Sequence, residues 1–174
     1  MIGAMTARPI LRFPDPRLRM PAHEIVAFDD ETRALARDLL DTMRAAPGIG
    51  ITAPHIGVLR RLVVIELPGE ALVRIYLNPR IVSACDEMAE HVEGSVSMPG
   101  VIEPVERPAR VGVRYRDLDG EEREEEADGL LSVCLKHEID QLDGIFWIQR
   151  LSRLRRERLL KRFGKQARTP LQGG

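Results

Sequence analysis

Residues 128–144 read DGLLSVCLKHEIDQLDG, and this segment predicts the helix around which the rest of the chain is arranged. Asp128 can cap its first turn, and Gly144 can end it. The apolar residues recur at helical spacing and cover most of the circumference, as in a helix that other elements surround. They are Leu130, Leu131, Cys134, Leu135, Ile139 and Leu142. The polar pair His137 and Glu138 therefore belongs to a central element.

The preceding segments predict another helix and several strands. Residues 29–46 place leucines and a methionine close to helical spacing. Residues 62–67 and 73–82 are β-branched and apolar, and an antiparallel meander is their simplest pairing. Residues 111–116 and 121–127 flank an Asp-Gly pair, which predicts a hairpin whose acidic second arm lies largely in solvent.

The segment LSRLRRERLLKRFGKQARTP predicts an amphipathic helix, with its basic part at about residues 151–165. Residues 150–168 hold nine Lys and Arg against one Glu, a local charge of +8. This face is either a docking surface for a phosphate-rich partner or the solvated side of a packing helix. The expected apolar side consists of Leu151, Leu154, Leu159, Leu160 and Phe163.

Composition restricts the class of protein. A chain of 174 residues is about one domain's worth, so we expect a single domain over 1–174. The net charge of -1 does not favour a polyanion-binding protein, and we expect no direct contact with DNA. No apolar run is long enough for a membrane span, and the start resembles no signal peptide, so we expect a cytoplasmic protein. Cys85 and Cys134 are interpreted as reduced thiols.

Three short segments contain residues suited to chemistry. The helical sequence HEIDQ has Gln141 where a zinc-binding H-E-x-x-H motif has its second histidine, so His137 is either a ligand or a hydrogen-bonded core histidine. Residues 93–100, EGSVSMPG, read as a turn-rich loop and lack the spacing of a nucleophile elbow. Residues 47–57, PGIGITAPHIG, lack the residues of a phosphate-binding loop.

In this order and at these separations, the three segments resemble the motifs of peptide deformylase. GIGITAPHIG is similar to the family pattern G-x-G-x-A-A-x-Q, EGSVSMPG to E-G-C-x-S, and KHEIDQLDG to Q-H-E-x-D-H. The resemblance covers nearly all of residues 8–165. It implies an α+β fold, in which antiparallel sheets wrap around the central motif helix and helices from both ends of the chain pack outside.

The resemblance also implies a reaction. In this family a divalent metal such as Fe²⁺, Ni²⁺ or Zn²⁺ is held by the cysteine and the two histidines, and the motif glutamate is the general acid and base. The metal-bound water removes the formyl group from N-formylmethionyl peptides. The motif glutamine and the backbone N–H after the cysteine hold the oxyanion.

Carried over residue by residue, the resemblance assigns the acid/base role to Glu138, one metal-ligand position to His137 and the backbone oxyanion donor to Val96. Three positions depart from the family pattern: Ser95 replaces the cysteine, Gln141 the second histidine, and His55 the oxyanion glutamine. The positions that match substrate-binding residues are Gly48, Ile49, Gly50, His91, Glu93, Gly94, Leu130, Val133 and Cys134.

A neutral hydroxyl and a carboxamide are poor ligands for a borderline metal, so we expect metal binding to be weak or absent. His55 could instead join His137 and Glu138 in a rearranged site. Without a metal, Ser95 and His137 should come within hydrogen-bonding reach. They would then form either a latent nucleophile or, with Gln141, a polar cluster whose members satisfy one another.

Two functions follow. The chain is a deformylase with an impaired metal centre, or it is a deformylase-like protein without activity that binds peptide N-termini or another small ligand. The apolar residues Ile49, Leu130, Val133 and Cys134 would supply the pocket in either case. The basic C-terminal helix suggests the ribosome as a partner.

Overall fold

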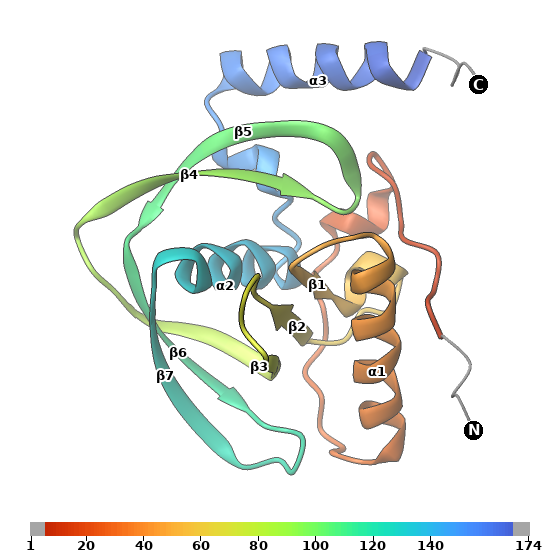
Figure 1. The fold of residues 1–174 in the computed structure, drawn as a ribbon, viewed down its shortest axis with the longest axis vertical. Coiled ribbons are helices and arrows are strands. Elements are labelled where there is room, and N and C mark those ends of the chain that lie inside the picture. Colours follow the sequence, from red (N-terminus) through yellow and green to blue (C-terminus); the bar gives the residue numbers. More distant parts are fainter. Residues whose placement is uncertain (1–5, 169–174) are drawn as a thin grey trace.

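The computed structural model describes residues 6–168, and Figure 1 shows their arrangement. The expected limits of the domain also include residues 1–5 and 169–174, which lie outside the described part. The helices are α1 (Asp30–Ala45), α2 (Gly129–Leu142) and α3 (Arg153–Arg168), with short 3-10 helices η1 (Pro16–Arg19), η2 (Ala53–Ile56) and η3 (Trp147–Arg150). The strands are β1 (Gly50–Thr52), β2 (Leu62–Glu66), β3 (Val73–Ala84), β4 (Met88–Ser95), β5 (Met98–Pro108), β6 (Arg110–Arg116) and β7 (Glu122–Asp128).

The strands form two antiparallel sheets. One has five strands in the order β1-β2-β3-β6-β7, and the other consists of β4 and β5. The predicted meander of β2 and β3 is confirmed, with Leu62 opposite Leu77. The predicted hairpin of β6 and β7 is also confirmed, with Val113 opposite Glu125. The expected α+β class is therefore correct.

The prediction of a loop at residues 93–100 is wrong. Most of this stretch belongs to the hairpin of β4 and β5, in which only Val96 and Ser97 form the turn. Glycine and proline made the sequence look irregular. Because the sheet has two strands, each of them is an edge, and an edge strand tolerates prolines such as Pro99 and Pro104.

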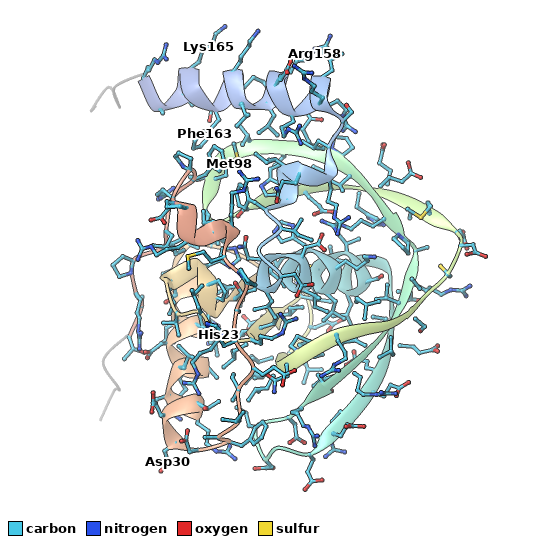
Figure 2. All side chains as sticks on the ribbon, turned by 180° about the vertical axis from the view of Figure 1, so that it is seen from behind. His23, Asp30, Met98, Arg158, Phe163 and Lys165 are labelled. Carbon is cyan, nitrogen blue, oxygen red and sulfur yellow. The ribbon has the colours of Figure 1, made fainter. Side chains whose placement is uncertain are left out.

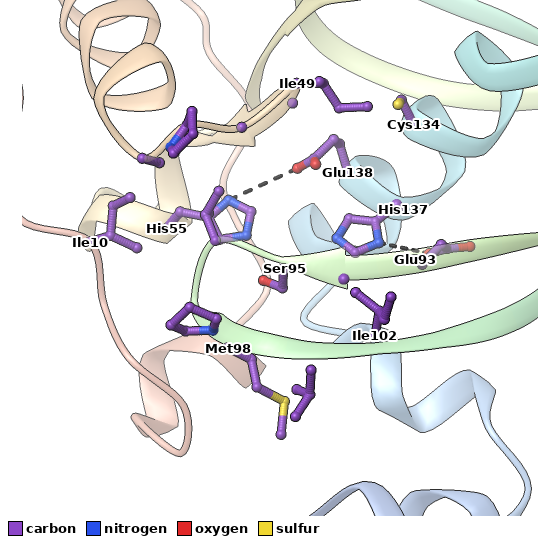
Figure 3. Close-up of a pocket in the computed structure, with 18 of the residues that line it drawn as sticks. Ile10, Ile49, His55, Glu93, Ser95, Met98, Ile102, Cys134, His137 and Glu138 are labelled. Atoms are coloured by element: carbon purple, nitrogen blue, oxygen red, sulfur yellow. Dashed lines mark hydrogen bonds and ion pairs between the residues drawn. The ribbon is translucent and has the colours of Figure 1, made fainter. Parts of the chain in front are cut away.

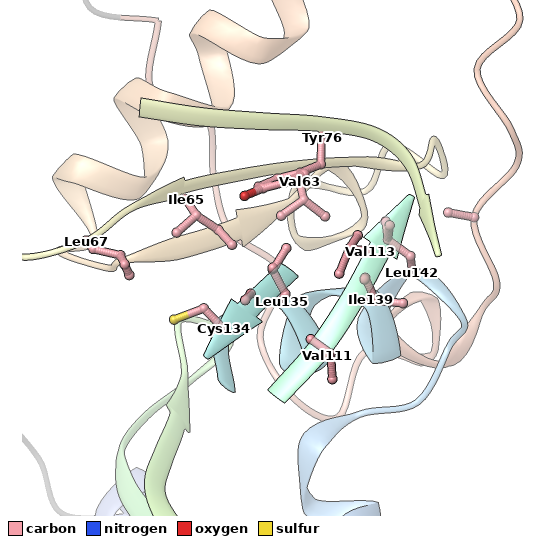
Figure 4. Close-up of a cluster of buried hydrophobic side chains, with 12 residues drawn as sticks. Val63, Ile65, Leu67, Tyr76, Val111, Val113, Cys134, Leu135, Ile139 and Leu142 are labelled. Atoms are coloured by element: carbon pink, nitrogen blue, oxygen red, sulfur yellow. The ribbon is translucent and has the colours of Figure 1, made fainter. Parts of the chain in front are cut away.

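The central position of α2 is confirmed (Figure 1). The helix contacts strands of both sheets, and its apolar side chains pack on β2, β3 and β6. Figure 4 shows Leu135, Ile139 and Leu142 among side chains from these strands. Asp128 stands at the N-cap position, but its side chain makes no capping hydrogen bond. The middle of the helix also buries His137 and Glu138, so two polar side chains lie inside a largely apolar frame.

The predicted helix at residues 29–46 corresponds to α1. The Asp29 carboxylate accepts a hydrogen bond from the Thr32 N–H at 3.0 Å and caps the first turn. Leu39 and Met43 are fully buried in a second core cluster, which packs against β1 and β2. This contact places β1 and the glycine-containing segment that precedes it beside α2.

The predicted C-terminal helix corresponds to α3, although residues 169 and 170 of the expected segment lie outside the described part. Leu159 is fully buried, whereas Leu154 is 56% exposed, so its assignment to the apolar side is wrong. The reason is that α3 packs on β5 along one narrow stripe. In Figure 2, Phe163 points toward the hairpin of β4 and β5, and Arg158 and Lys165 point away from it.

Two arginines of α3 form hydrogen bonds with β5. Arg155 and Arg162 both donate to the Glu103 carboxylate, with the Arg155 bond at 2.8 Å. They also lower the pKa of Glu103. Part of the basic charge of α3 is therefore used within the protein. Among the helices of residues 6–168, none combines the length and the apolar composition that crossing a membrane requires.

Candidate functional site

A pocket of about 560 Å³ lies where α2, β1 and the hairpin of β4 and β5 meet (Figure 3). It brings together most of the predicted site residues, although they are far apart in the sequence. Its lining consists of Ile10, Arg12, Ala45, Ala46, Pro47, Gly48, Ile49, Gly50, His55, Val92, Glu93, Gly94, Ser95, Val96, Met98, Pro99, Gly100, Val101, Ile102, Leu130, Val133, Cys134, His137 and Glu138.

Two predicted site residues do not line this pocket. His91 lies opposite Val105 in the hairpin and is partly exposed. It precedes the part of the hairpin, residues 92–102, that borders the pocket. Gln141 is buried, and its side-chain amide donates to the Leu18 carbonyl oxygen at 2.7 Å. The carboxamide therefore attaches the N-terminal segment to α2. His91 lies outside the pocket lining, and its role in substrate binding stays a prediction.

His137 is held by a chain of buried charges. Its Nδ1 lies 2.8 Å from Glu93 Oε1. Arg107 donates two hydrogen bonds to the same carboxylate, at 2.6 and 2.9 Å, and a third to Asp140 at 2.9 Å. Arg150 donates to Asp140 as well. Each carboxylate has an arginine partner, which is what burial of charges requires.

These contacts set the charge states of Glu93 and His137. Burial alone would raise the pKa of Glu93, but the hydrogen bonds from His137 and Arg107 lower it to about 2. Burial would likewise lower the pKa of His137, but the bond to Glu93 and the nearby Glu138 charge raise it above its ordinary value. Because Glu93 is an ionised acceptor, the Nδ1 of His137 carries a proton, and Nε2 is the nitrogen that gains or loses the second proton.

His55 has the opposite arrangement of protons. Its Nδ1 accepts a hydrogen bond from the Thr52 N–H at 2.9 Å. Burial, with the nearby His137 charge, lowers the pKa of His55 to about 3, so the ring is neutral. A neutral imidazole that accepts at Nδ1 carries its proton at Nε2. This Nε2–H is buried in the pocket wall and has no partner among the described residues.

The Glu138 carboxyl group lies over Gly50. A β-carbon at Gly50 would stand 2.9 Å from Glu138 Oε1, so the close approach requires glycine there. The Glu138 Oε2 atom is buried, has no hydrogen bond partner within residues 6–168, and lies 3.9 Å from the Nδ1 of His55. This contact is not an ion pair because His55 is neutral. Burial raises the pKa of Glu138 to about 7.

Ser95 ends β4 at the pocket. Its Oγ accepts a hydrogen bond from the Ser97 N–H at 3.1 Å. No hydrogen bond among residues 6–168 joins Ser95, His137 and Gln141 to one another, so neither the expected polar cluster nor the expected hydrogen bond between Ser95 and His137 is formed. The reason is that each side chain bonds to another residue: Ser95 to Ser97, His137 to Glu93, and Gln141 to Leu18.

The sequence did not indicate the residues that hold Glu93 and His137 in place. Arg107 lies within a strand, and Asp140 appeared only as part of the helical motif. A buried glutamate needs a cation, but nothing in the sequence indicates which of the many arginines supplies it. Ile10 and Ile102 of the pocket were also missed. Within residues 6–168, no three or more His, Cys, Asp or Glu side chains are grouped so that they could hold a metal ion.

The pocket and its frame define a class of α+β proteins. In this class a helical His–Glu pair, enclosed by antiparallel sheets, faces a β-hairpin. A family model described as polypeptide deformylase matches residues 7–157. The chain belongs to the peptide deformylase family, whose members depend on a metal and act on the formylated N-termini of nascent peptides.

Individual relatives agree with the family model. A Brucella melitensis protein named peptide deformylase-like is 65% identical over 164 residues, which are 94% of this chain and all of that protein. A peptide deformylase of Afipia carboxidovorans is 44% identical over 167 residues, covering 94% of this chain and 98% of the relative. The crystal structure of a peptide deformylase from Legionella pneumophila has a TM-score of 0.84 and 40% identity, and the match covers 94% of this chain and 99% of that one.

Proposed function

We propose that this chain has lost most or all metal-dependent deformylation and that its pocket binds the N-terminal residue of peptides. The observation that carries this proposal is the set of side chains at the three ligand positions that the resemblance assigns. Ser95 supplies a neutral hydroxyl, Gln141 donates its amide to Leu18, and His137 alone supplies an imidazole. These donors do not suit the metal on which the family depends.

The estimated loss of metal-binding free energy supports loss of the metal. If each replaced ligand costs about 3 kcal/mol, the affinity falls roughly a hundredfold per position. Two replacements then weaken metal binding by about four orders of magnitude.

A rearranged site with His55 is disfavoured by the proton positions. The Nδ1 lone pair of His55 is engaged with the Thr52 N–H, and its Nε2 carries a proton. A metal ligand needs a free lone pair on an imidazole nitrogen. His55 would have to give up the Thr52 bond to coordinate a metal.

The pocket offers apolar side chains and N–H donors that suit a binding function. Ile49, Val133 and Cys134 offer an apolar wall, and burial raises the pKa of Cys134 to about 12, so the thiol is uncharged. The Nε2–H of His55 and the N–H of Val96 are the donors we assign to a peptide carbonyl. An apolar pocket with a few convergent donors is typical of a small-ligand site. We therefore infer that a methionyl N-terminus fits it best.

Calorimetric titration of the chelator-treated protein with a Met-Ala-Ser peptide tests this proposal. We expect saturable binding, with at least tenfold weaker binding of Asp-Ala-Ser and of the Val133→Asp variant. The exposed substitution Val26→Asp is the matched control, because Val26 is 87% exposed outside the pocket. Equal binding of the two peptides would contradict recognition of the side chain.

The second candidate is a deformylase with an impaired metal centre. The burial of Glu138 next to His137 favours it, because a carboxyl group at that place could accept a proton from water. Turnover that depends on added metal would decide for this candidate.

We also propose the ribosome as a partner of α3. The exposed residues Arg158 and Lys161 contribute to the net positive charge of the helix and suit the phosphates of RNA. Charge reversal of both residues should abolish co-sedimentation with ribosomes at low salt. Unchanged co-sedimentation would remove the proposal.

A further inference from the structure

Ser95, His137 and Glu93 line one pocket and are the residue types of a hydrolase triad, of which the His137–Glu93 contact is formed. The Glu93 carboxylate, fixed by Arg107, holds the Nδ1 of His137 at 2.8 Å. The basic Nε2 of His137 is then the atom available to a neighbouring hydroxyl. Ser95 lines the same pocket, and Figure 3 shows it between the rings of His55 and His137.

The hydroxyl of Ser95 is free to act as a donor. Its oxygen accepts from the Ser97 N–H, which fixes one side of the group, but its proton has no acceptor among residues 6–168. No hydrogen bond joins it to His137 in this structure. Rotation about the Cα–Cβ bond of Ser95 would exchange the bond from Ser97 for one to His137, and catalytic hydrogen bonds often form or tighten only when substrate is bound.

The same pocket contains two N–H donors. Val96 follows Ser95 directly and lies in the turn between β4 and β5, where its N–H makes none of the backbone hydrogen bonds of the described loops and turns. The second donor is the buried, unpartnered Nε2–H of His55. A backbone N–H next to the nucleophile together with a side-chain N–H is the composition of many oxyanion holes.

We propose that Ser95 and His137, positioned by Glu93, form a metal-independent acyl-transfer site that hydrolyses uncharged carboxylic esters. The inference rests on the proposed function in one respect, because it needs a pocket in which no metal holds His137. The wall of the pocket favours an apolar acyl group, because Ile49 and Val133 line it.

The reaction consumes one ester and one water molecule and needs no oxidant or reductant. Ser95 Oγ bonds to the ester carbonyl carbon while its proton passes to His137 Nε2, and the carbonyl oxygen becomes the oxyanion. The oxyanion collapses, the bond to the alcohol oxygen breaks, and His137 protonates the departing alcohol. Water then attacks the acyl-Ser95 ester and gives one proton to His137. The bond from the acyl carbon to Ser95 Oγ breaks, His137 returns its proton to Oγ, and the carboxylic acid leaves.

Labelling with a fluorophosphonate, followed by peptide mass spectrometry, tests the inference in the presence of EDTA. We expect a phosphonyl group on Ser95 and hydrolysis of p-nitrophenyl butyrate. Both signals should fall at least a hundredfold in Ser95→Ala and in His137→Gln, with thermal unfolding used to check that each variant is folded. Ser83→Ala is the control, because Ser83 is exposed on β3 outside the pocket.

Glu93 acts through His137, so its test needs a readout beyond stability. His137 faces Glu93 and Arg107 of the hairpin, Glu138 of its own helix and His55 of η2. Glu93→Gln should move the pH profile of the labelling rate to lower pH, because the carboxylate no longer stabilises the imidazolium. A lower rate at an unchanged pH profile would assign Glu93 a purely structural role.

The outcomes separate this inference from the proposed function. Absence of labelling in the folded protein, or labelling at a serine other than Ser95, would overturn the acyl-transfer site and leave the binding function intact. Formate release that depends on added metal would overturn the proposed function, whatever the labelling result.

Discussion

Gln141 on α2 and Leu18 in η1 are joined by a hydrogen bond of 2.7 Å from the side-chain amide to the carbonyl oxygen. This bond is buried and spans 123 residues of sequence. It gives the carboxamide a structural use in holding the N-terminal segment against the central helix. The same contact takes Gln141 out of the set of residues that line the pocket.

Removal of this bond should cost stability. We expect Gln141→Ala to lower the free energy of unfolding by about 1–2 kcal/mol, because the Leu18 carbonyl is left buried without a donor. Gln166→Ala is the matched control, since that amide also donates to a backbone carbonyl, at 3.0 Å, but at an exposed position. Its expected cost is below about 0.5 kcal/mol. Urea unfolding measures both, and equal losses would contradict the structural role of Gln141.

Glu138 should make stability depend on pH. Its pKa is raised from 4.5 to about 7 in the folded protein, so its contribution is fully present below pH 4.5 and is lost as the pH rises through 7. The free energy of unfolding of the unaltered protein, relative to Glu138→Gln, should fall by roughly 3 kcal/mol over that range. Urea unfolding from pH 4.5 to 8 with a chelator measures it. Parallel curves for the two proteins would contradict the burial of this carboxyl group.

Leu159 is a fully buried side chain in the contact between α3 and β5. Leu159→Ala should cost about 2–4 kcal/mol, because Leu159 is fully buried between α3 and β5. Leu154→Ala, at a position that is 56% exposed, should cost less than about 0.5 kcal/mol. Denaturant unfolding compares the two variants. A larger loss for Leu154 would mean that α3 packs through its other face.

Restoration of the family's ligands should restore metal binding. The double variant Ser95→Cys, Gln141→His is expected to bind Zn²⁺ roughly a thousandfold or more tightly than the unaltered chain, because a thiolate and a second imidazole replace two poor donors. Equilibrium dialysis with metal analysis measures this affinity, and Cys85→Ser in the same background controls for binding to the other partly exposed thiol. Equally tight binding by the unaltered chain would show that the present donors suffice.

Much of the fold was predictable because it depends on local patterns. The apolar circumference of α2 indicated a buried helix, and Asp119-Gly120 indicated the hairpin of β6 and β7. The hairpin of β4 and β5 was missed, because prolines on edge strands resemble those of a loop. The exposure of Leu154 was missed because spacing alone does not give the width of the contact between α3 and β5.

The residues of the site were predictable from the sequence, but the contacts among them were not. Resemblance to the family located His137, Glu138 and Ser95, and the structure places them in one pocket. The proton on His55 Nε2 follows from the Thr52 N–H, which is a property of the backbone turn rather than of the motif. The partner of Glu93 lies 14 residues away at Arg107, where no local pattern identifies it.

Formate release from an N-formyl-methionyl tripeptide measures whether this chain retains metal-dependent deformylation. The protein is stripped of metal and then supplied anaerobically with Fe²⁺, Ni²⁺, Co²⁺ or Zn²⁺, beside Glu138→Gln and the double variant Ser95→Cys, Gln141→His. We expect no metal-dependent release by the unaltered chain and metal-dependent release by the double variant. Metal-dependent release by the unaltered chain that disappears in Glu138→Gln would contradict this expectation.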